Sequence, residues 1–198
     1  MRCGISLIGD NGQKIFSGQV RGDMMPERLA FILETVILIC IVWLIFFLST
    51  LLHEIGHAAG YMIATGDGHW SIRVGSGRRL FSVKRLTVKM LPFDGCFVPS
   101  EKGRIDTTAK LISMLSGGPA VSLILVVLLI AMRSGYLSMH TDVISAGAVE
   151  FLLNTALWVN SVILILSLIP IHYFHGEIKG METDGLQIVN AVRKRKDR

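Results

Sequence analysis

Cysteine is scarce in this chain, and no pattern of a signal peptide is evident in its first thirty residues. The 198 residues include only three cysteines, Cys3, Cys40 and Cys96, which are widely spaced. One of them lies inside a long apolar stretch, so neither a disulfide framework nor a cysteine-rich zinc site is indicated. The first residues carry charges throughout and contain no apolar core, so no cleavable leader is expected.

Charge is also absent from long stretches of the sequence, and 51% of the residues are hydrophobic. Three apolar segments are expected to form membrane spans, at about 31–52, 111–132 and 151–171. A helix rises 1.5 Å per residue, so each segment is long enough to cross the hydrocarbon of a bilayer. We therefore expect an all-α polytopic membrane protein with three spans.

The interval between the first two expected spans does not have a helical pattern. Residues 70–75 and 80–88 alternate in polarity as strands do, and residues 91–99 return as an apolar loop with a turn at Asp94-Gly95. A small membrane-associated β element is expected between spans 1 and 2.

The distribution of the net charge of +5 predicts an orientation. Residues 66–109 hold eight lysines or arginines, and the segment after Ile171 holds six. By the positive-inside rule, loop 66–109 and the C-terminus are cytosolic and the N-terminus lies outside the cytoplasmic membrane. We expect an extracytoplasmic segment 1–28, a membrane-embedded core 29–190 and a basic cytosolic tail 191–198, which contacts anionic lipid rather than nucleic acid.

The pentapeptide His53-Glu54-Ile55-Gly56-His57 follows the first apolar segment directly. On a helix, the two histidines lie on one face and can bind one metal ion, while Glu54 is rotated by about 100° and can hold a water molecule beside it. This pattern is typical of zinc hydrolases. The plainer interpretation is two interfacial histidines, but ionisable groups at a membrane span usually mark function.

A catalytic zinc ion commonly has three protein ligands, so the pair needs a partner. Spacing alone does not choose among the candidates, which are Asp184, Glu182, His172, His175 and Glu150. Gly56 and Gly60 would let another helix approach at the level of the metal, and Ser116-Gly117-Gly118-Pro119 in the second span has the small residues needed for such a contact.

With these motifs in order, the chain from about Phe31 to Val189 resembles the site-2 protease family of intramembrane zinc metalloproteases. The features that carry the resemblance are the histidine motif, the Leu91-Pro92-Phe93-Asp94-Gly95 loop, the Ser116-Gly117-Gly118-Pro119 segment, and an Asp-Gly pair, Asp184-Gly185, after Pro170. Two positions depart from the family: Ser167 and Ser122 stand where the family usually has asparagine.

The resemblance implies a three-span metalloprotease core and a zinc endopeptidase that hydrolyses a peptide bond in or near a transmembrane segment of a membrane protein or peptide precursor. His53, His57 and Asp184 would bind Zn²⁺, and Glu54 would act as the general base. Asn160 lies seven residues before Ser167 and could assist at the scissile carbonyl in place of the missing asparagine. The implied partners are the lipid bilayer and a membrane-embedded substrate, with no nucleic acid.

Two alternatives stay open at the level of sequence. One is another membrane zincin, with Glu150 or a histidine as the third ligand. The other is a non-catalytic, immunity-type membrane protein that binds a peptide, which the presence of Glu54 disfavours because a binder needs no general base. A transporter is disfavoured because three spans leave little room for a pathway and no inverted repeat is visible.

Overall fold

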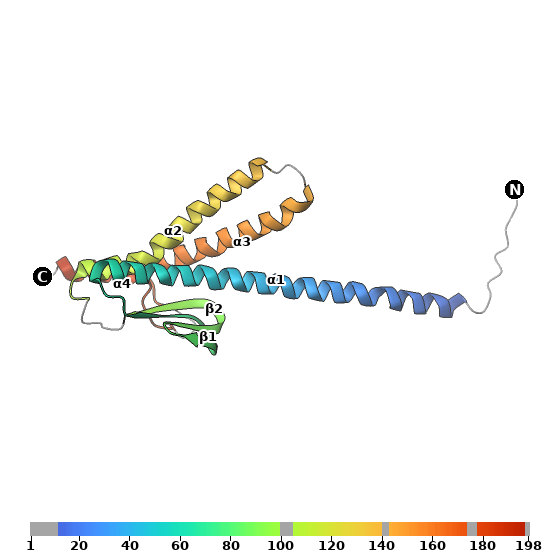
Figure 1. The fold of residues 1–198 in the computed structure, drawn as a ribbon, viewed down its shortest axis with the longest axis horizontal. Helices are drawn as coiled ribbons and strands as arrows, with labels where there is room; N and C mark the ends of the chain where they lie inside the picture. The colour runs from blue at the N-terminus through green and yellow to red at the C-terminus, as the bar shows by residue number, and fades with distance from the viewer. Residues whose placement is uncertain (1–11, 100–104, 140–142, 174–177, 197–198) are drawn as a thin grey trace. The chain divides into compact units, whose positions relative to one another are not determined.

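The computed structural model describes residues 12–99, 105–139, 143–173 and 178–196. In chain order the elements are α1 (Gly12–Thr65), β1 (Trp70–Val83), β2 (Leu86–Pro99), α2 (Thr108–Met139), α3 (Val143–Leu168) and α4 (Asp184–Lys196), as Figure 1 shows. The chain divides into two compact units, Met1–Ile41 and Val42–Arg198. The first unit contains the N-terminal part of α1, and the second contains the rest of α1 and all the other described elements.

The expected all-α class is wrong, because two 14-residue strands form an antiparallel sheet between α1 and α2. Alternating apolar residues supply the reason: Ile72, Val74 and Val88 are almost fully buried, and Ile72 and Val74 form a small core with Ala58 of α1. Burying one face of the strands against a helix makes the sheet a full part of the fold.

The two strands bend, so that the first half of β1 has a partner on each side. Residues 72–74 pair with residues 95–97 near the end of β2 and also with residues 86–88 at its beginning. The bend falls at Gly75 and Gly77, whose φ angles are 90° and 80°. A Cβ at Gly75 would lie 2.6 Å from the Leu91 carbonyl oxygen, so only glycine allows the strands to approach this closely.

The turn expected at Asp94-Gly95 is wrong, and the turn of the hairpin lies elsewhere. Asp94 and Gly95 lie within β2, and the expected strand 80–88 is interrupted by the turn at residues 84–85. Lys84 adopts a φ of 49° there. This left-handed conformation is usually marked in a sequence by glycine or asparagine, so a lysine gives no sign of the turn.

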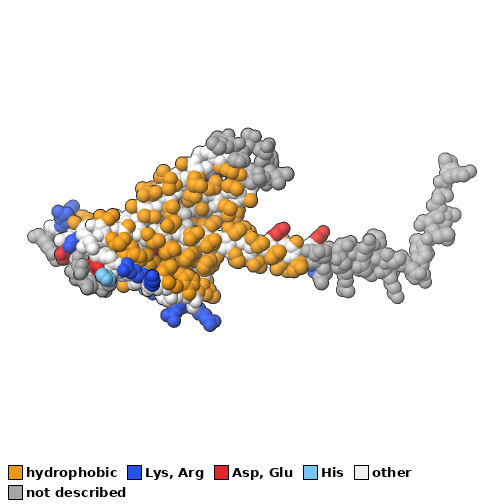
Figure 2. Space-filling model, in the orientation of Figure 1, with side chains coloured by type: hydrophobic (Ala, Val, Ile, Leu, Met, Phe, Trp, Pro, Cys, Tyr) orange, Lys and Arg blue, Asp and Glu red, His pale blue; other side chains and the backbone are white. Residues whose placement is uncertain are grey.

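Three helical segments are long and apolar enough to cross a membrane: Glu27–Thr65, Thr108–Tyr136 and Gly147–Leu168. They include most of the three expected spans, although helix α3 ends at Leu168, before the expected limit at 171, and α1 begins at Gly12. Large apolar side chains are exposed along α2 and α3, and Figure 2 shows hydrophobic side chains over much of the visible face of these helices. Of the expected segment 1–28, residues 1–11 lie outside the described part of the chain.

Helices α1 and α2 approach one another to backbone contact. A Cβ on Gly56 would lie 2.4 Å from the carbonyl oxygen of Gly117, and one on Gly60 would lie 2.3 Å from that of Ser113. Ser113 also donates a hydrogen bond from its hydroxyl to the Gly60 carbonyl. The close helix approach predicted from these glycines is confirmed.

Candidate metal centre

Helix α1 carries the first three site residues, on either side of its contact with α2 at Gly56. His53, Glu54 and His57 are each only 6% exposed. Because residues four apart lie on one helical face, the two imidazoles meet, with their Nε2 atoms 3.2 Å apart.

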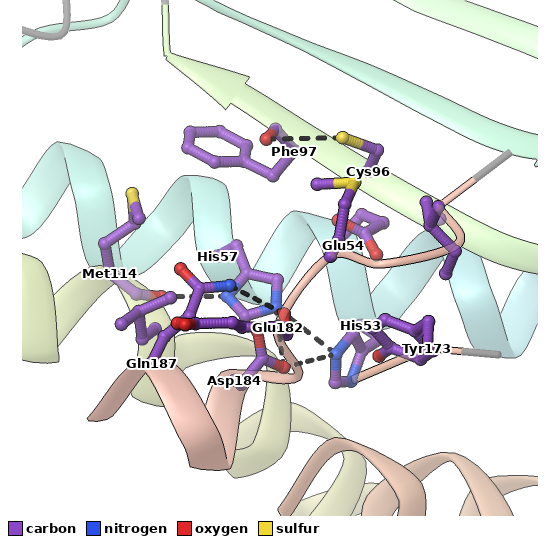
Figure 3. A pocket seen from close by; sticks show the side chains of 14 residues that line it. His53, Glu54, His57, Cys96, Phe97, Met114, Tyr173, Glu182, Asp184 and Gln187 are labelled. Atoms are coloured by element: carbon purple, nitrogen blue, oxygen red, sulfur yellow. Dashed lines mark hydrogen bonds and ion pairs between the residues drawn. The ribbon is translucent and has the colours of Figure 1, made fainter. Parts of the chain in front are cut away.

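Asp184, the first residue of α4, completes a triangle with the two histidines. Its Oδ2 lies 3.4 Å from His53 Nε2 and 3.3 Å from His57 Nε2, as the dashed lines in Figure 3 indicate. Around a tetrahedral zinc ion with bonds of about 2.0–2.1 Å, neighbouring ligand atoms are separated by about 3.3 Å. The three donor atoms therefore already have the spacing of one face of a zinc tetrahedron.

The segment before α4 fixes Asp184 in this position. Thr183 is almost fully buried: its hydroxyl donates to the Ile169 carbonyl and accepts from the Leu186 N–H in the first turn of α4, so it is the N-cap of this helix. A Cβ at Gly185 would lie 2.0 Å from the Leu168 carbonyl oxygen at the end of α3. The Asp-Gly pair thus combines a ligand with the close packing that positions it.

Asp184 is held as an anion. Burial alone would raise the pKa of this carboxyl group, but the hydrogen bonds to His53 and His57 outweigh burial and lower the pKa to about 2. One carboxylate oxygen and two imidazole nitrogens repel one another unless a proton or a metal cation lies between them.

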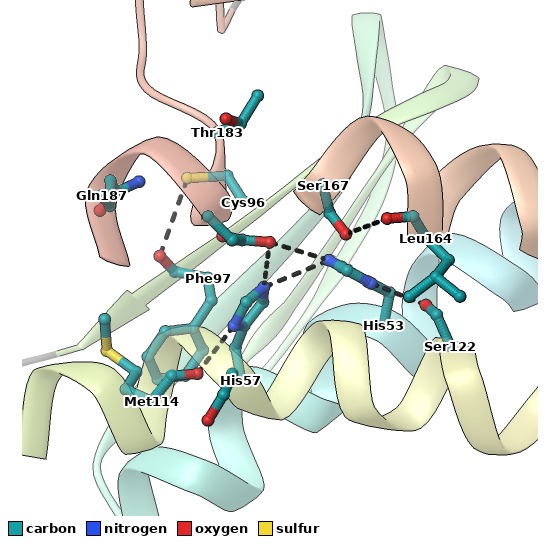
Figure 4. A network of polar contacts seen from close by, with 12 residues as sticks. His53, His57, Cys96, Phe97, Met114, Ser122, Leu164, Ser167, Thr183 and Gln187 are labelled. Carbon is teal, nitrogen blue, oxygen red and sulfur yellow. Dashed lines mark hydrogen bonds and ion pairs between the residues drawn. The ribbon is translucent and has the colours of Figure 1, made fainter. Parts of the chain in front are cut away.

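The outer ring nitrogens of both histidines are hydrogen-bonded, as Figure 4 shows. His57 Nδ1 lies 2.9 Å from the Met114 carbonyl oxygen, which can only accept, so this nitrogen carries a proton. When the ring is neutral, as a metal ligand must be, its Nε2 offers a lone pair inward. His53 Nδ1 lies 2.8 Å from the hydroxyl of Ser122, which is fully buried. Such outer partners orient histidine ligands in metal sites.

The space between the ligands is kept open by a glycine of α2. A Cβ on Gly118 would lie 2.4 Å from His57 Nε2 and 2.7 Å from His53 Nε2, so any side chain there would enter the position of the metal. Two imidazole nitrogens and one carboxylate oxygen are a ligand set of catalytic zinc sites. The residues present therefore fit a zinc ion.

Glu54 faces the same cavity, which has a volume of about 170 Å³. A Cβ on Gly95 would lie 2.3 Å from Glu54 Oε1, so β2 lies directly over the carboxylate. The backbone N–H of Phe97 donates a hydrogen bond to it. The missing side chain at position 95 gives the general-base candidate the room that it needs, and explains why this glycine lies in a strand.

The other candidate third ligands are placed elsewhere. Among the described residues, the group that could hold a metal ion consists of His53, His57 and Asp184. Glu150 lies 3.9 Å from Arg133, and His172 is exposed and forms a β-bridge with Glu182. Glu182 lines the cavity but accepts a hydrogen bond from Asn190, and His175 lies outside the described residues.

Asn160 is not brought into the cavity. Its Nδ2 donates to the Ser49 hydroxyl at 3.0 Å and to the Ala156 carbonyl at 2.8 Å, which uses both of its N–H groups. Ser167 donates its hydroxyl to the Leu164 carbonyl. Neither residue offers a donor to a substrate in this arrangement.

Sequence reasoning missed several residues around the metal position. Ser122 drew notice only as a departure from a family pattern, and Thr183 and the Met114 carbonyl drew none. Tyr173, between α3 and α4, lines the cavity as well. Only the Thr before the Asp-Gly pair carried a usable local signal, since threonine is favoured at helix N-caps.

In comparisons with protein-family models, curated proteins and solved structures, no match to this chain is found. The functional argument therefore depends on the chemistry of the site itself.

Proposed function

We propose that this chain is a zinc-dependent endopeptidase of the site-2 protease type, which hydrolyses a peptide bond in or near a transmembrane segment. One observation carries the proposal. His53, His57 and Asp184 present three donor atoms 3.2–3.4 Å apart, in a cavity that they share with the buried carboxylate of Glu54.

The residues of the site have separate tasks. His53, His57 and Asp184 would hold zinc, which when bound lowers the pKa of water and polarises a carbonyl group. Glu54 would accept a proton from the attacking water at its carboxylate as the new C–O bond forms. It would then give that proton to the leaving nitrogen as the peptide C–N bond breaks.

The apolar helices around the site support a substrate in the bilayer. Two ligands and the base candidate belong to a helical segment that is long and apolar enough to span a membrane. Exposed apolar side chains on α2 and α3 are suited to lipid or to an apolar substrate segment rather than to water. We further propose the orientation that the basic residues indicate, with loop 66–109 on the cytosolic side.

A non-catalytic peptide-binding protein is the rival function. The burial of Glu54 beside the three candidate ligands favours hydrolysis, because burying a carboxylate is costly and a binding site gains nothing from it.

Cleavage by a Glu54→Gln variant tests the proposal. The protein would be purified in detergent without chelators and assayed with a panel of fluorescence-quenched peptides that contain apolar transmembrane-type segments. We expect Glu54→Gln to keep its zinc and lose cleavage by a factor of about 10² or more, because it keeps the ligands and removes the base. Glu150→Gln, which changes a carboxylate paired with Arg133, is the control and should cleave like the wild type.

Equal cleavage by the wild type and Glu54→Gln would contradict the proposed mechanism. A wild-type protein that holds zinc but cleaves none of the peptides would favour the binding function.

A further inference from the structure

Peptide hydrolysis at this site is faster with a hydrogen-bond donor, besides zinc, for the carbonyl oxygen that gains negative charge. The amide expected to supply it is Asn160, whose N–H groups are both engaged away from the cavity. Ser167, at the position where the family resemblance expects an asparagine, also donates within its own helix. A side-chain donor would therefore come from another part of the cavity wall.

Tyr173 brings a hydroxyl group to that wall. Figure 3 draws its side chain among those that line the cavity with His53, Glu54 and Asp184. Within the described part of the chain, the Tyr173 hydroxyl makes no hydrogen bond, whereas the hydroxyl of Tyr61 is bonded to Asp67. A half-buried phenol beside a metal position, whose O–H has no partner among the described residues, is available to a ligand.

Backbone hydrogen bonds tie Tyr173 to the segment that leads into Asp184. The Tyr173 N–H donates to the Met181 carbonyl at 2.9 Å, and its carbonyl accepts from the Gly180 N–H at 2.8 Å. The neighbouring His172–Glu182 bridge and the Thr183 N–H to Ile171 carbonyl bond continue this ladder. Tyr173 and Asp184 therefore belong to the two arms of one tied loop, and the placement of the ligand also places the phenol.

The charges around Tyr173 keep its proton in place. Burial first, and then the carboxylates of Asp184, Glu54 and Asp94, raise the pKa of the phenol above its ordinary value. Even an unperturbed phenol is protonated at neutral pH, so Tyr173 is a neutral O–H donor.

We propose that Tyr173 is a catalytic residue whose Oη–H donates a hydrogen bond to the oxygen of the scissile carbonyl as that oxygen becomes negative. This inference rests on the proposed hydrolysis. No proton leaves Tyr173: the proton of the attacking water passes through Glu54, and Tyr173 contributes by being closer to the developing charge than to the neutral carbonyl.

Two other side-chain donors of the described cavity wall, Gln187 and Cys96, each make one contact within the protein. Gln187 Nε2 donates to the Glu182 carbonyl at 2.9 Å, and Cys96 Sγ is directed to the Phe97 carbonyl at 3.8 Å. Gln187 retains a second N–H, which makes it the competitor to test.

The test measures inhibitor affinity, so it does not depend on turnover. Zinc-loaded protein in detergent would be titrated calorimetrically with a phosphinic dipeptide that carries two leucine side chains, whose tetrahedral phosphorus has two oxygens and mimics the charge of the transition state. Isobutyl thiol, which has a single metal-binding sulfur and no oxygen for Tyr173, is the second ligand. We expect Tyr173→Phe to weaken phosphinate binding by about tenfold or more and to leave thiol binding unchanged.

Tyr136→Phe is the matched control, because it removes a phenol hydroxyl outside the residues that line the cavity. It should bind both ligands like the wild type. On any peptide that the wild type cleaves, Tyr173→Phe should lower kcat with little change in KM, because the bond forms only as charge develops.

The two proposals fail in different ways. If the wild type binds both ligands and Tyr173→Phe binds phosphinate equally well, Tyr173 is not the donor although the metal site stands. If Gln187→Leu loses phosphinate affinity and Tyr173→Phe does not, the donor is Gln187. If the wild type binds neither zinc nor either ligand, the proposed function fails and this inference fails with it.

Discussion

Ser122 illustrates how a single hydroxyl can act on a metal site without touching the metal. It is fully buried in α2, and its Oγ lies 2.8 Å from His53 Nδ1. The His53 ring is thereby held with Nε2 toward Asp184 and His57. Without this partner, a buried N–H would be left unsatisfied and the ring would be free to rotate.

Ser122→Ala should weaken zinc affinity by about 10–100-fold, the usual effect of removing an outer partner of a histidine ligand. Competition with a chelator of known affinity would measure it. Ser116→Ala is the control, since Ser116 is exposed on the same helix and bonds only within it. Equal zinc affinity in all three proteins would show that the Ser122 hydroxyl does not orient His53.

Site residues were predictable where the chemistry is local. His53 and His57 were identified because their spacing alone places two imidazoles on one helical face. Ser122 could not be found in this way, because its role depends on how α2 lies against α1. Tyr173 was equally hidden, since a lone tyrosine carries no signal until the loop between α3 and α4 is seen to tie it beside Asp184.

Among the secondary-structure elements, helices α1 and α2 and the contact between them matter most for the site. This contact brings Gly118 and Ser122 to the two histidines, and it requires the absence of side chains at the crossing. A Cβ on Gly117 would lie 2.1 Å from the Gly56 carbonyl oxygen, which belongs to the backbone and cannot move aside without moving the helix.

Gly117→Ala should therefore destabilise the protein, by about 1–3 kcal/mol, as overpacking usually does. Gly135→Ala on the same helix should have the opposite sign, because a Cβ there meets no atom within 4 Å and alanine favours a helix over glycine. Thermal unfolding in detergent would compare the two. A higher melting temperature for Gly117→Ala would show that the helices do not meet as described.

The hairpin shows where reading elements from sequence fails. Asp94-Gly95 has the composition of a turn, yet it continues β2, because Gly95 is needed beside the Glu54 carboxylate. The real turn includes Lys84, which gives no turn signal. A glycine can serve either backbone freedom or close approach, and the sequence does not distinguish the two uses.

At the scale of the whole chain, the long apolar segments were predictable because composition decides them, whereas the sheet was underestimated. Alternation predicted short strands, but their pairing on both sides of residues 72–74 depends on contacts between distant residues. The proposed enzyme likewise depends on residues that are distant in the sequence. Helix α1 supplies two metal ligands and the general base, and α4 supplies the third ligand. Helix α2 leaves space for the metal and supplies the hydrogen-bond partners of the two histidines. Family resemblance, rather than spacing, singled out Asp184 among five candidates.

The central claim is that one zinc ion is held by His53 and His57 together with Asp184, which is far from them in the sequence. Elemental analysis of the purified protein tests this claim most directly. We predict about one zinc per chain in the wild type and in Glu150→Ala, and little or none in His53→Ala and Asp184→Ala, because three protein ligands are needed for a tight catalytic site. Zinc that survives Asp184→Ala, or that is lost in Glu150→Ala, would contradict the account.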